Sequence, residues 1–143
     1  MYPSMISPED AHGLIDSVTL FEIEGALKSF KRDRSPGPDG WPVEFFIHFL
    51  DLLGKDLLSA IECARKSGRI TPSLNSTFLA LIPKKDKPVT FADFRLISLC
   101  NLIYKLISKI IAVRLKPFFD SHISREQYGF FKNRQIVELI GIT

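Results

Sequence analysis

The sequence predicts an α+β fold that is mostly helical, with one short antiparallel β-hairpin. Three segments, 20–32, 42–67 and 101–115, carry apolar residues at the three- and four-residue spacing of amphipathic helices. Two short apolar runs, 77–82 and 94–99, are joined by a charged turn, which is typical of paired antiparallel strands. A chain of 143 residues is long enough for one such domain and too short for two comfortable cores.

The first helix is expected over residues 20–32. Thr19 and Glu22 have the spacing of a capping box, in which two side chains satisfy free backbone N–H groups at a helix start. Basic residues crowd the end of this helix, where cations oppose the negative end of the helix dipole, and this explains them better than a binding site does. The loop Ser-Pro-Gly-Pro-Asp-Gly at 35–40 follows, and its prolines and glycines exclude regular structure.

A helical hairpin or kinked helix over residues 42–67 is expected to supply most of the core. Gly54 is a candidate break in it, and Gly68 is a candidate C-terminal cap. The next long helix is expected over residues 101–115, with Pro117 as its stop.

The strand pair brings cations together. The run 77–82 is predicted to be a buried strand, and Lys84 and Lys85 follow it directly, while Arg95 lies at the start of the second strand. Adjacent arms of a hairpin hold such groups side by side, where Arg can grip phosphate oxygens in pairs and Lys adds a point charge. A plain surface hairpin is the alternative.

The end of the chain shows a further helical pattern. A short turn is expected from Ser124, and Asn133 is placed to cap a helix over residues 134–140. This pattern has no stop signal before Thr143, which indicates a truncated end.

Charge is distributed unevenly along the chain. The net charge is +3, but residues 1–27 contain five acidic groups and no basic one, so all 19 basic groups and the other 11 acidic groups lie in residues 28–143. We expect residues 1–18 to form an acidic leader, partly disordered, and residues 19–143 to form the domain. A cationic body fits a polyanion such as nucleic acid or nucleotide phosphate, although a solvated surface explains it equally well.

Several classes of protein are excluded. No apolar run approaches the roughly 18–20 residues of a membrane span, and the start lacks the features of a signal peptide. Two cysteines do not make a disulfide scaffold, so we expect an intracellular protein, nuclear or cytoplasmic, without a membrane partner. Three scattered histidines and no Cys/His cluster predict no metal site, and no Walker loop, nucleophile elbow or dinucleotide fingerprint is present.

Five motifs in one order carry a resemblance to a known family. They are SPGPDG at 35–40, LIPK at 81–84, DFRLISLCN at 93–101, YKLISK at 104–109 and QYGFFKNR at 127–134. Each is weak alone, but in register over about a hundred residues they are specific. Together they resemble the N-terminal part of the reverse transcriptase domain of LINE-type (non-long-terminal-repeat) retrotransposons, particularly those of plants. The resemblance covers roughly residues 9–143.

The resemblance implies the fingers and the start of the palm of a right-hand polymerase. In that family the cations of the strand pair bind the triphosphate of the incoming nucleotide. Here that role would fall to Lys84, Lys85 and Arg95. An RNA or DNA template and a deoxynucleoside triphosphate are therefore the implied partners.

Two further sets of residues are assigned by the resemblance. Gln127, Phe130 and Arg134 match a block that shapes the template and nucleotide side of the cleft. The SPGPDG loop resembles the family's leading loop near the template, and a structural role is expected for its residues Gly37, Asp39 and Gly40.

The family's metal-binding aspartates have no counterpart in this sequence. Reverse transcriptases hold two Mg²⁺ ions with palm aspartates, and we find no segment that resembles those blocks. We therefore expect a fragment of an RNA-directed DNA polymerase that is truncated before the catalytic palm, needs the missing palm as a partner, and has no catalytic residue or cofactor of its own. A non-enzymatic nucleic-acid-binding module and a functionless retroelement relic remain as alternatives.

Overall fold

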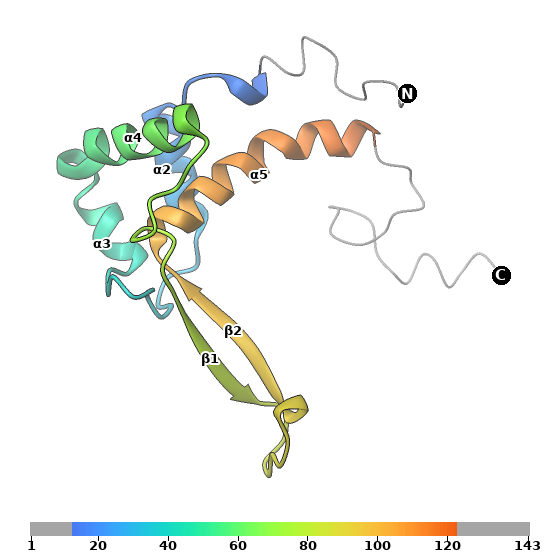
Figure 1. Ribbon diagram of the computed structural model, residues 1–143. Helices are drawn as coiled ribbons and strands as arrows, with labels where there is room; N and C mark the ends of the chain where they lie inside the picture. The colour runs from blue at the N-terminus through green and yellow to red at the C-terminus, as the bar shows by residue number, and fades with distance from the viewer. Residues whose placement is uncertain (1–12, 123–143) are drawn as a thin grey trace. The chain divides into compact units, whose positions relative to one another are not determined.

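The computed structural model describes residues 13–122, with side chains as far as Asp120 (Figure 1). Residues 17–110 form one compact unit, and residues 13–16 and 111–122 belong to another. In chain order the elements are α2 (Leu20–Ser29), α3 (Val43–His48), α4 (Leu50–Ser67), β1 (Thr77–Pro83), the 3₁₀ helix η1 (Phe91–Asp93), β2 (Phe94–Cys100) and α5 (Leu102–His122). The predicted α+β class, mostly helical with one antiparallel hairpin, is confirmed.

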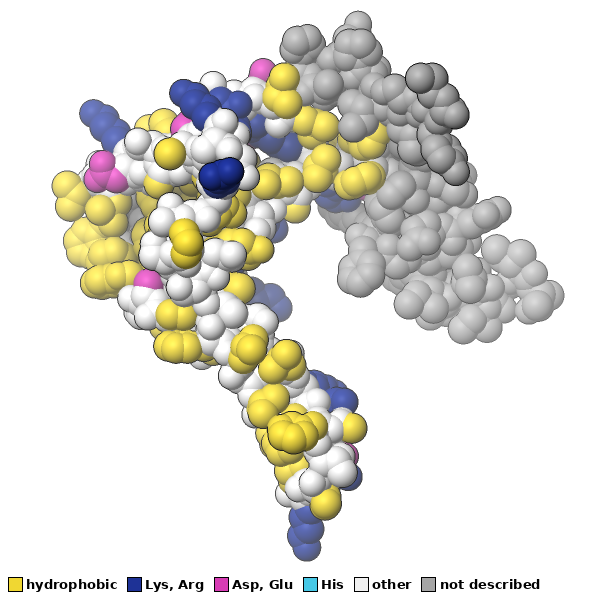
Figure 2. Space-filling model, viewed as in Figure 1, with side chains coloured by type: hydrophobic (Ala, Val, Ile, Leu, Met, Phe, Trp, Pro, Cys, Tyr) yellow, Lys and Arg dark blue, Asp and Glu magenta, His cyan; other side chains and the backbone are white. Residues whose placement is uncertain are grey.

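The hydrophobic core of the unit 17–110 lies between α2, α3, α4 and the first turns of α5. Each helix contributes one apolar face, as its periodicity predicts. The buried apolar residues are Val18, Ile23, Ala26, Leu27, Val43, Phe46, Leu57, Ile61, Leu102, Leu106, Ile107 and Ile110. Hydrophobic side chains also reach the surface over α3 and the start of α4 (Figure 2).

Helix α2 begins as predicted and ends early. The N–H of Glu22 donates to Thr19 Oγ1 at 3.2 Å, and the N–H of Thr19 donates to the Glu22 carboxylate at 2.9 Å, which confirms the capping box. The helix stops at Ser29, three residues before the predicted end. The Ser29 hydroxyl donates to the carbonyl of Ala26 at 2.7 Å, and Phe30 takes an extended backbone. A hydroxyl that bonds a helix carbonyl competes with continuation of the helix.

The sequence indicated Gly54 as a candidate break in the helical segment after the SPGPDG loop. The structure places the break at Phe49 instead. Phe49 lies between α3 and α4 with φ −102° and ψ 21°, and its ring packs at 5.0 Å from that of Phe45. Gly54 is buried within α4, where a Cβ atom would be 3.4 Å from Leu20 Cδ2. A Cβ atom at this position would therefore make an ordinary van der Waals contact with α2. Gly68, at φ +65°, ends α4 as predicted.

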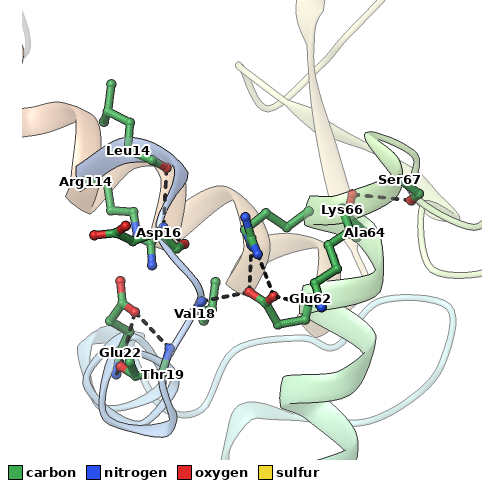
Figure 3. A network of polar contacts seen from close by, with 11 residues as sticks. Leu14, Asp16, Val18, Thr19, Glu22, Glu62, Ala64, Lys66, Ser67 and Arg114 are labelled. Atoms are coloured by element: carbon green, nitrogen blue, oxygen red, sulfur yellow. Dashed lines mark hydrogen bonds and ion pairs between the residues drawn. The ribbon is translucent and has the colours of Figure 1, made fainter. Parts of the chain in front are cut away.

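Glu62 ties the segment before α2 to α4 (Figure 3). Its Oε1 accepts the N–H of Val18 at 2.7 Å, and both carboxylate oxygens accept hydrogen bonds from Arg65 at 2.7 and 2.8 Å. The hydrogen bonds from Arg65, followed by that from the Val18 N–H, lower the pKa of Glu62 to about 2. The carboxylate is therefore a charged anchor for the start of the helical unit.

Helix α5 continues past Pro117, although the sequence predicted that this proline would stop it. A proline inside a helix removes one N–H and leaves the carbonyl four residues earlier without its donor. That carbonyl belongs to Val113, a residue that is 56% exposed. The ion pair between Lys116 and Asp120, at 2.7 Å, spans the proline turn and supports it.

Strands β1 and β2 pair antiparallel, from Thr77 opposite Cys100 to Pro83 opposite Phe94. This confirms the predicted strand pair, and each strand is one residue longer than expected. The prediction that the first strand is buried is wrong, because only Ala80 of β1 is partly buried. The hairpin extends away from the helices of its unit (Figure 1), and most residues of its two strands are exposed.

Some predicted elements lie outside the described residues. These are most of the acidic leader, the turn from Ser124 and the helix over residues 134–140. In the portion that the structure describes, no helix has both the length and the apolar character needed to cross a membrane.

Candidate functional site

The hairpin ladder places Lys84 and Arg95 on one face. Arg95 is the register partner of Ile82, and the N–H of Lys84 donates to the carbonyl of Asp93 at 2.7 Å, which extends the ladder by one residue. Since every second residue of a strand points to the same face, Lys84 shares the face of Ile82 and Arg95. Both cations are exposed, and Lys and Arg side chains lie along one side and at the far end of the hairpin in Figure 2.

The three cations predicted to bind phosphate have different partners. Lys84 Nζ donates to the carbonyl of Ala92 at 2.8 Å, a neutral partner that leaves its charge unbalanced. Lys85 Nζ instead forms an ion pair with Asp93 Oδ1 at 2.8 Å. Arg95 has neither a hydrogen bond nor an ion pair from its side chain within residues 13–122.

Asp93 organises the end of the hairpin. Its Oδ2 accepts the N–H groups of Val89 at 2.9 Å and Thr90 at 3.0 Å, and Thr90 and Asp93 form a capping box around η1. The hydrogen bond from Lys85, followed by those from the two N–H groups, lowers the pKa of Asp93 to about 2. The sequence analysis missed this residue. Its signal was the Thr-x-x-Asp spacing, the same spacing that identified the start of α2.

The SPGPDG loop has a geometric reason for each residue expected to be structural. The N–H of Gly40 donates to the carbonyl of Gly37 at 3.0 Å, and Gly40 has φ +74°, which suits glycine. Asp39 Oδ1 accepts the N–H of Trp41 at 3.2 Å, as in an Asx turn. Gly37 lies so close to the junction of β2 and α5 that a Cβ atom would be 2.5 Å from the Asn101 nitrogen.

Asn101 joins this loop to the root of the hairpin. It is only 3% exposed, and its Oδ1 accepts the N–H of Asp39 at 3.1 Å. Its Nδ2 donates to the carbonyl of Ser73, just before β1, at 2.9 Å. A buried amide with both ends bonded fixes three segments that are far apart in the chain. No local pattern marks this role, since the partners lie 62 and 28 residues away.

A cationic pocket of about 150 Å³ lies beside the loop. Its walls include Lys31 and Arg34 after α2, Trp41, and Lys105 on α5. The indole of Trp41 stacks on Phe45, with ring centroids 4.2 Å apart, and the residue remains 49% exposed. None of the three cations has a side-chain hydrogen bond or ion pair with another described residue.

This pocket corrects the interpretation of two basic residues. From the sequence, Lys31 and Arg34 were expected among the basic residues at the end of the first helix. Because α2 stops at Ser29, only Lys28 lies in its last turn, and the two later residues belong to the loop wall. An exposed aromatic ring with nearby unpaired cations is the composition of single-stranded nucleic-acid sites.

Part of the predicted site cannot be placed. Gln127, Phe130 and Arg134 lie outside the described residues. Within residues that are described, no group of three or more His, Cys, Asp or Glu side chains could hold a metal ion. Among the described residues, the candidate site therefore consists of the hairpin end and the pocket beside the loop.

Two comparisons with known proteins bear on this site. Residues 82–142 match the family described as reverse transcriptase (RNA-dependent DNA polymerase), so the match includes Lys84, Lys85 and Arg95. The chain is also similar to the "Transposon TX1 uncharacterized 149 kDa protein" of Xenopus laevis, with 33% identity over 134 residues. The similarity covers 94% of this chain and 10% of that protein, so the chain spans about a tenth of its relative's length. These findings confirm the resemblance that the five motifs indicated.

Proposed function

We infer that this chain is a segment of the reverse transcriptase of a LINE-type retrotransposon, and we propose that its hairpin binds the triphosphate of an incoming nucleotide. The observation that carries the proposal is the position of Lys84 and Arg95 on one exposed face of the β1–β2 hairpin, where no carboxylate of the described residues is bonded to either. Cations fixed in this way can neutralise charge on a polyphosphate and on the pyrophosphate leaving group.

In the polymerase as a whole, we propose that this segment supplies the fingers and the start of the palm. An exposed hairpin next to a helical unit is suited to close on a nucleotide from one side. The family's two Mg²⁺ ions would stabilise the attacking and leaving oxygens, but the described residues offer no group of carboxylates to hold them. We therefore derive no catalytic step for this segment.

The direct test is calorimetric titration of the 143-residue chain with dTTP. We expect Lys84→Met and Arg95→Met each to weaken binding about tenfold, since a hydrogen bond to a charged group contributes roughly 1.5–3 kcal/mol. Lys55→Met is the matched control, because Lys55 is an exposed lysine of α4 outside the site. Equal affinity in all four proteins would contradict the proposal.

A second test concerns catalysis. We propose that the 143-residue polypeptide by itself does not polymerise, because its described residues cannot hold the two ions. Primer extension on an RNA template with Mg²⁺ should give no product above a no-protein background. Sustained incorporation of nucleotides would overturn this part of the proposal.

The pocket beside the loop favours a second candidate function, a contact with the nucleic-acid template. Lys31, Arg34 and Lys105 can meet the phosphates of a single strand while a base stacks on Trp41. If the chain is instead a non-enzymatic nucleic-acid-binding module, it will bind oligonucleotides through this pocket and bind no dTTP. If neither Lys84→Met nor Arg95→Met changes the binding of dTTP or of an oligonucleotide, a relic without biochemical function is favoured.

A further inference from the structure

We propose that Asp93 is a positioning residue that orders the end of the hairpin, and that Lys85 serves Asp93 and does not bind phosphate. This inference rests on the proposed function, since it divides the three cations assigned to the triphosphate into two that bind it and one that supports them. Asp93 is the first residue of the motif DFRLISLCN, and the resemblance assigned it no role.

Asp93 contacts both arms of the hairpin and the turn between them. Its side chain is 17% exposed; Oδ1 pairs with Lys85 on the first arm, and Oδ2 accepts two N–H groups of the turn, those of Val89 and Thr90. Its main-chain carbonyl accepts the N–H of Lys84 at 2.7 Å. A single residue therefore closes the loop from 84 to 93. Removing it would leave two backbone donors without their acceptor.

The same residue determines where the two phosphate-facing cations lie. The N–H of Lys84 is held directly by the carbonyl of Asp93, and Arg95 lies two residues further along the chain, in β2. Lys85 differs from both because a carboxylate already balances its charge at 2.8 Å. A lysine in such a pair must lose a strong partner before it can bind an anion, whereas Lys84 would exchange only a neutral carbonyl.

Removing the charge of Asp93 tests the inference, because the positioning role and simple electrostatics predict opposite changes in dTTP affinity. Simple electrostatics predicts that Asp93→Ala binds dTTP more tightly, because a negative charge near the site is removed and Lys85 is released. The positioning role predicts the opposite, a weakening of about fivefold or more, because the loop that holds Lys84 loses its order. Hydrogen exchange of the Val89 and Thr90 amides should become faster in the same variant.

The lysines of the loop supply matched controls with equal changes in net charge. We expect Lys84→Met to weaken dTTP binding about tenfold, Lys85→Met less than threefold, and Lys87→Met not measurably. Lys87 is an exposed loop residue with no ion pair or side-chain hydrogen bond to any described residue. Lys85→Met should also speed exchange at Val89 and Thr90, and Lys85→Arg should restore both the affinity and the slow exchange.

Two results would overturn the inference. One is an Asp93→Ala chain that binds dTTP as tightly as the original or more tightly. The other is a loss in Lys85→Met as large as that in Lys84→Met. If the unchanged chain binds no dTTP, the proposed function fails, and the amide exchange of Asp93→Ala still decides whether Asp93 orders the loop.

Discussion

Gly37 lies against the backbone of Asn101, and the contact leaves no room for a side chain at position 37. A Cβ atom there would be 2.5 Å from the Asn101 nitrogen and 2.5 Å from the Cys100 carbonyl carbon. Both neighbours are backbone atoms, which cannot move aside without disturbing the junction of β2 and α5. The loop and the junction therefore form one packed unit.

Gly37→Ala should destabilise the chain by about 1–3 kcal/mol, because overpacking forces backbone shifts. Gly25→Ala is the control, since no atom lies within 4 Å of a Cβ at that position in α2. We expect the control to stabilise by about 0.5–1 kcal/mol, the ordinary gain for alanine in a helix. Urea denaturation followed by circular dichroism measures both. Equal effects of the two substitutions would show that the contact is not tight.

Asn101→Ala should cost roughly 1–3 kcal/mol of unfolding free energy, because it leaves the N–H of Asp39 and the carbonyl of Ser73 without their partner. Asn75→Ala, at an exposed position nearby, should change stability by less than about 0.5 kcal/mol. Urea denaturation of the two variants is the measurement. A cost at position 101 no larger than at position 75 would refute the joining role of this amide.

Trp41 is the only tryptophan of the sequence, so its fluorescence reports on the pocket directly. A single-stranded oligouridylate should quench it, with an affinity that falls as salt rises. Lys105→Met should reduce the slope of log affinity against log salt by about 0.7, the value for one phosphate contact in a single strand. Lys55→Met should leave the slope unchanged. Absence of quenching at low salt would exclude a nucleic-acid contact at this pocket.

Glu62→Gln should lower stability at neutral pH and change it little in acid. The pKa of Glu62 is about 2 in the folded chain against an ordinary value of 4.5, so its contribution is complete above pH 4.5 and is lost as the pH falls toward 2. Urea midpoints of the original chain and the variant should therefore differ at pH 7 and converge near pH 2. Glu24→Gln, in an exposed pair with Lys28, should show a smaller difference. A difference in urea midpoint that stays constant from pH 7 to pH 2 would contradict the anchoring role of the carboxylate.

Features that depend on a few neighbouring residues could be predicted from the sequence. The capping box at Thr19, the left-handed cap at Gly68 and the pairing of the two strands all follow from local backbone preferences. The break at Phe49 and the passage of α5 through Pro117 could not, because Phe49 carries no local break signal and a proline ordinarily ends a helix.

The candidate site shows the same division. The pairing of the two strands could be predicted from the sequence, and the shared face of Lys84 and Arg95 follows from that pairing. The ion pair of Lys85 with Asp93 and the pocket around Trp41 depend on how a loop folds back and where α2 ends. Such contacts have no periodicity from which they could be predicted.

The exposed hairpin also determines how this polypeptide behaves at high concentration. Phe78, Leu79, Leu81 and Leu96 are each more than half exposed, and within the described residues no further strand covers the outer edge of β1 or β2. Ribbons of this kind aggregate edge to edge unless a charge prevents it. Leu79→Lys, on the face opposite Arg95, is thus the first substitution to make when a monodisperse preparation is needed for crystallisation.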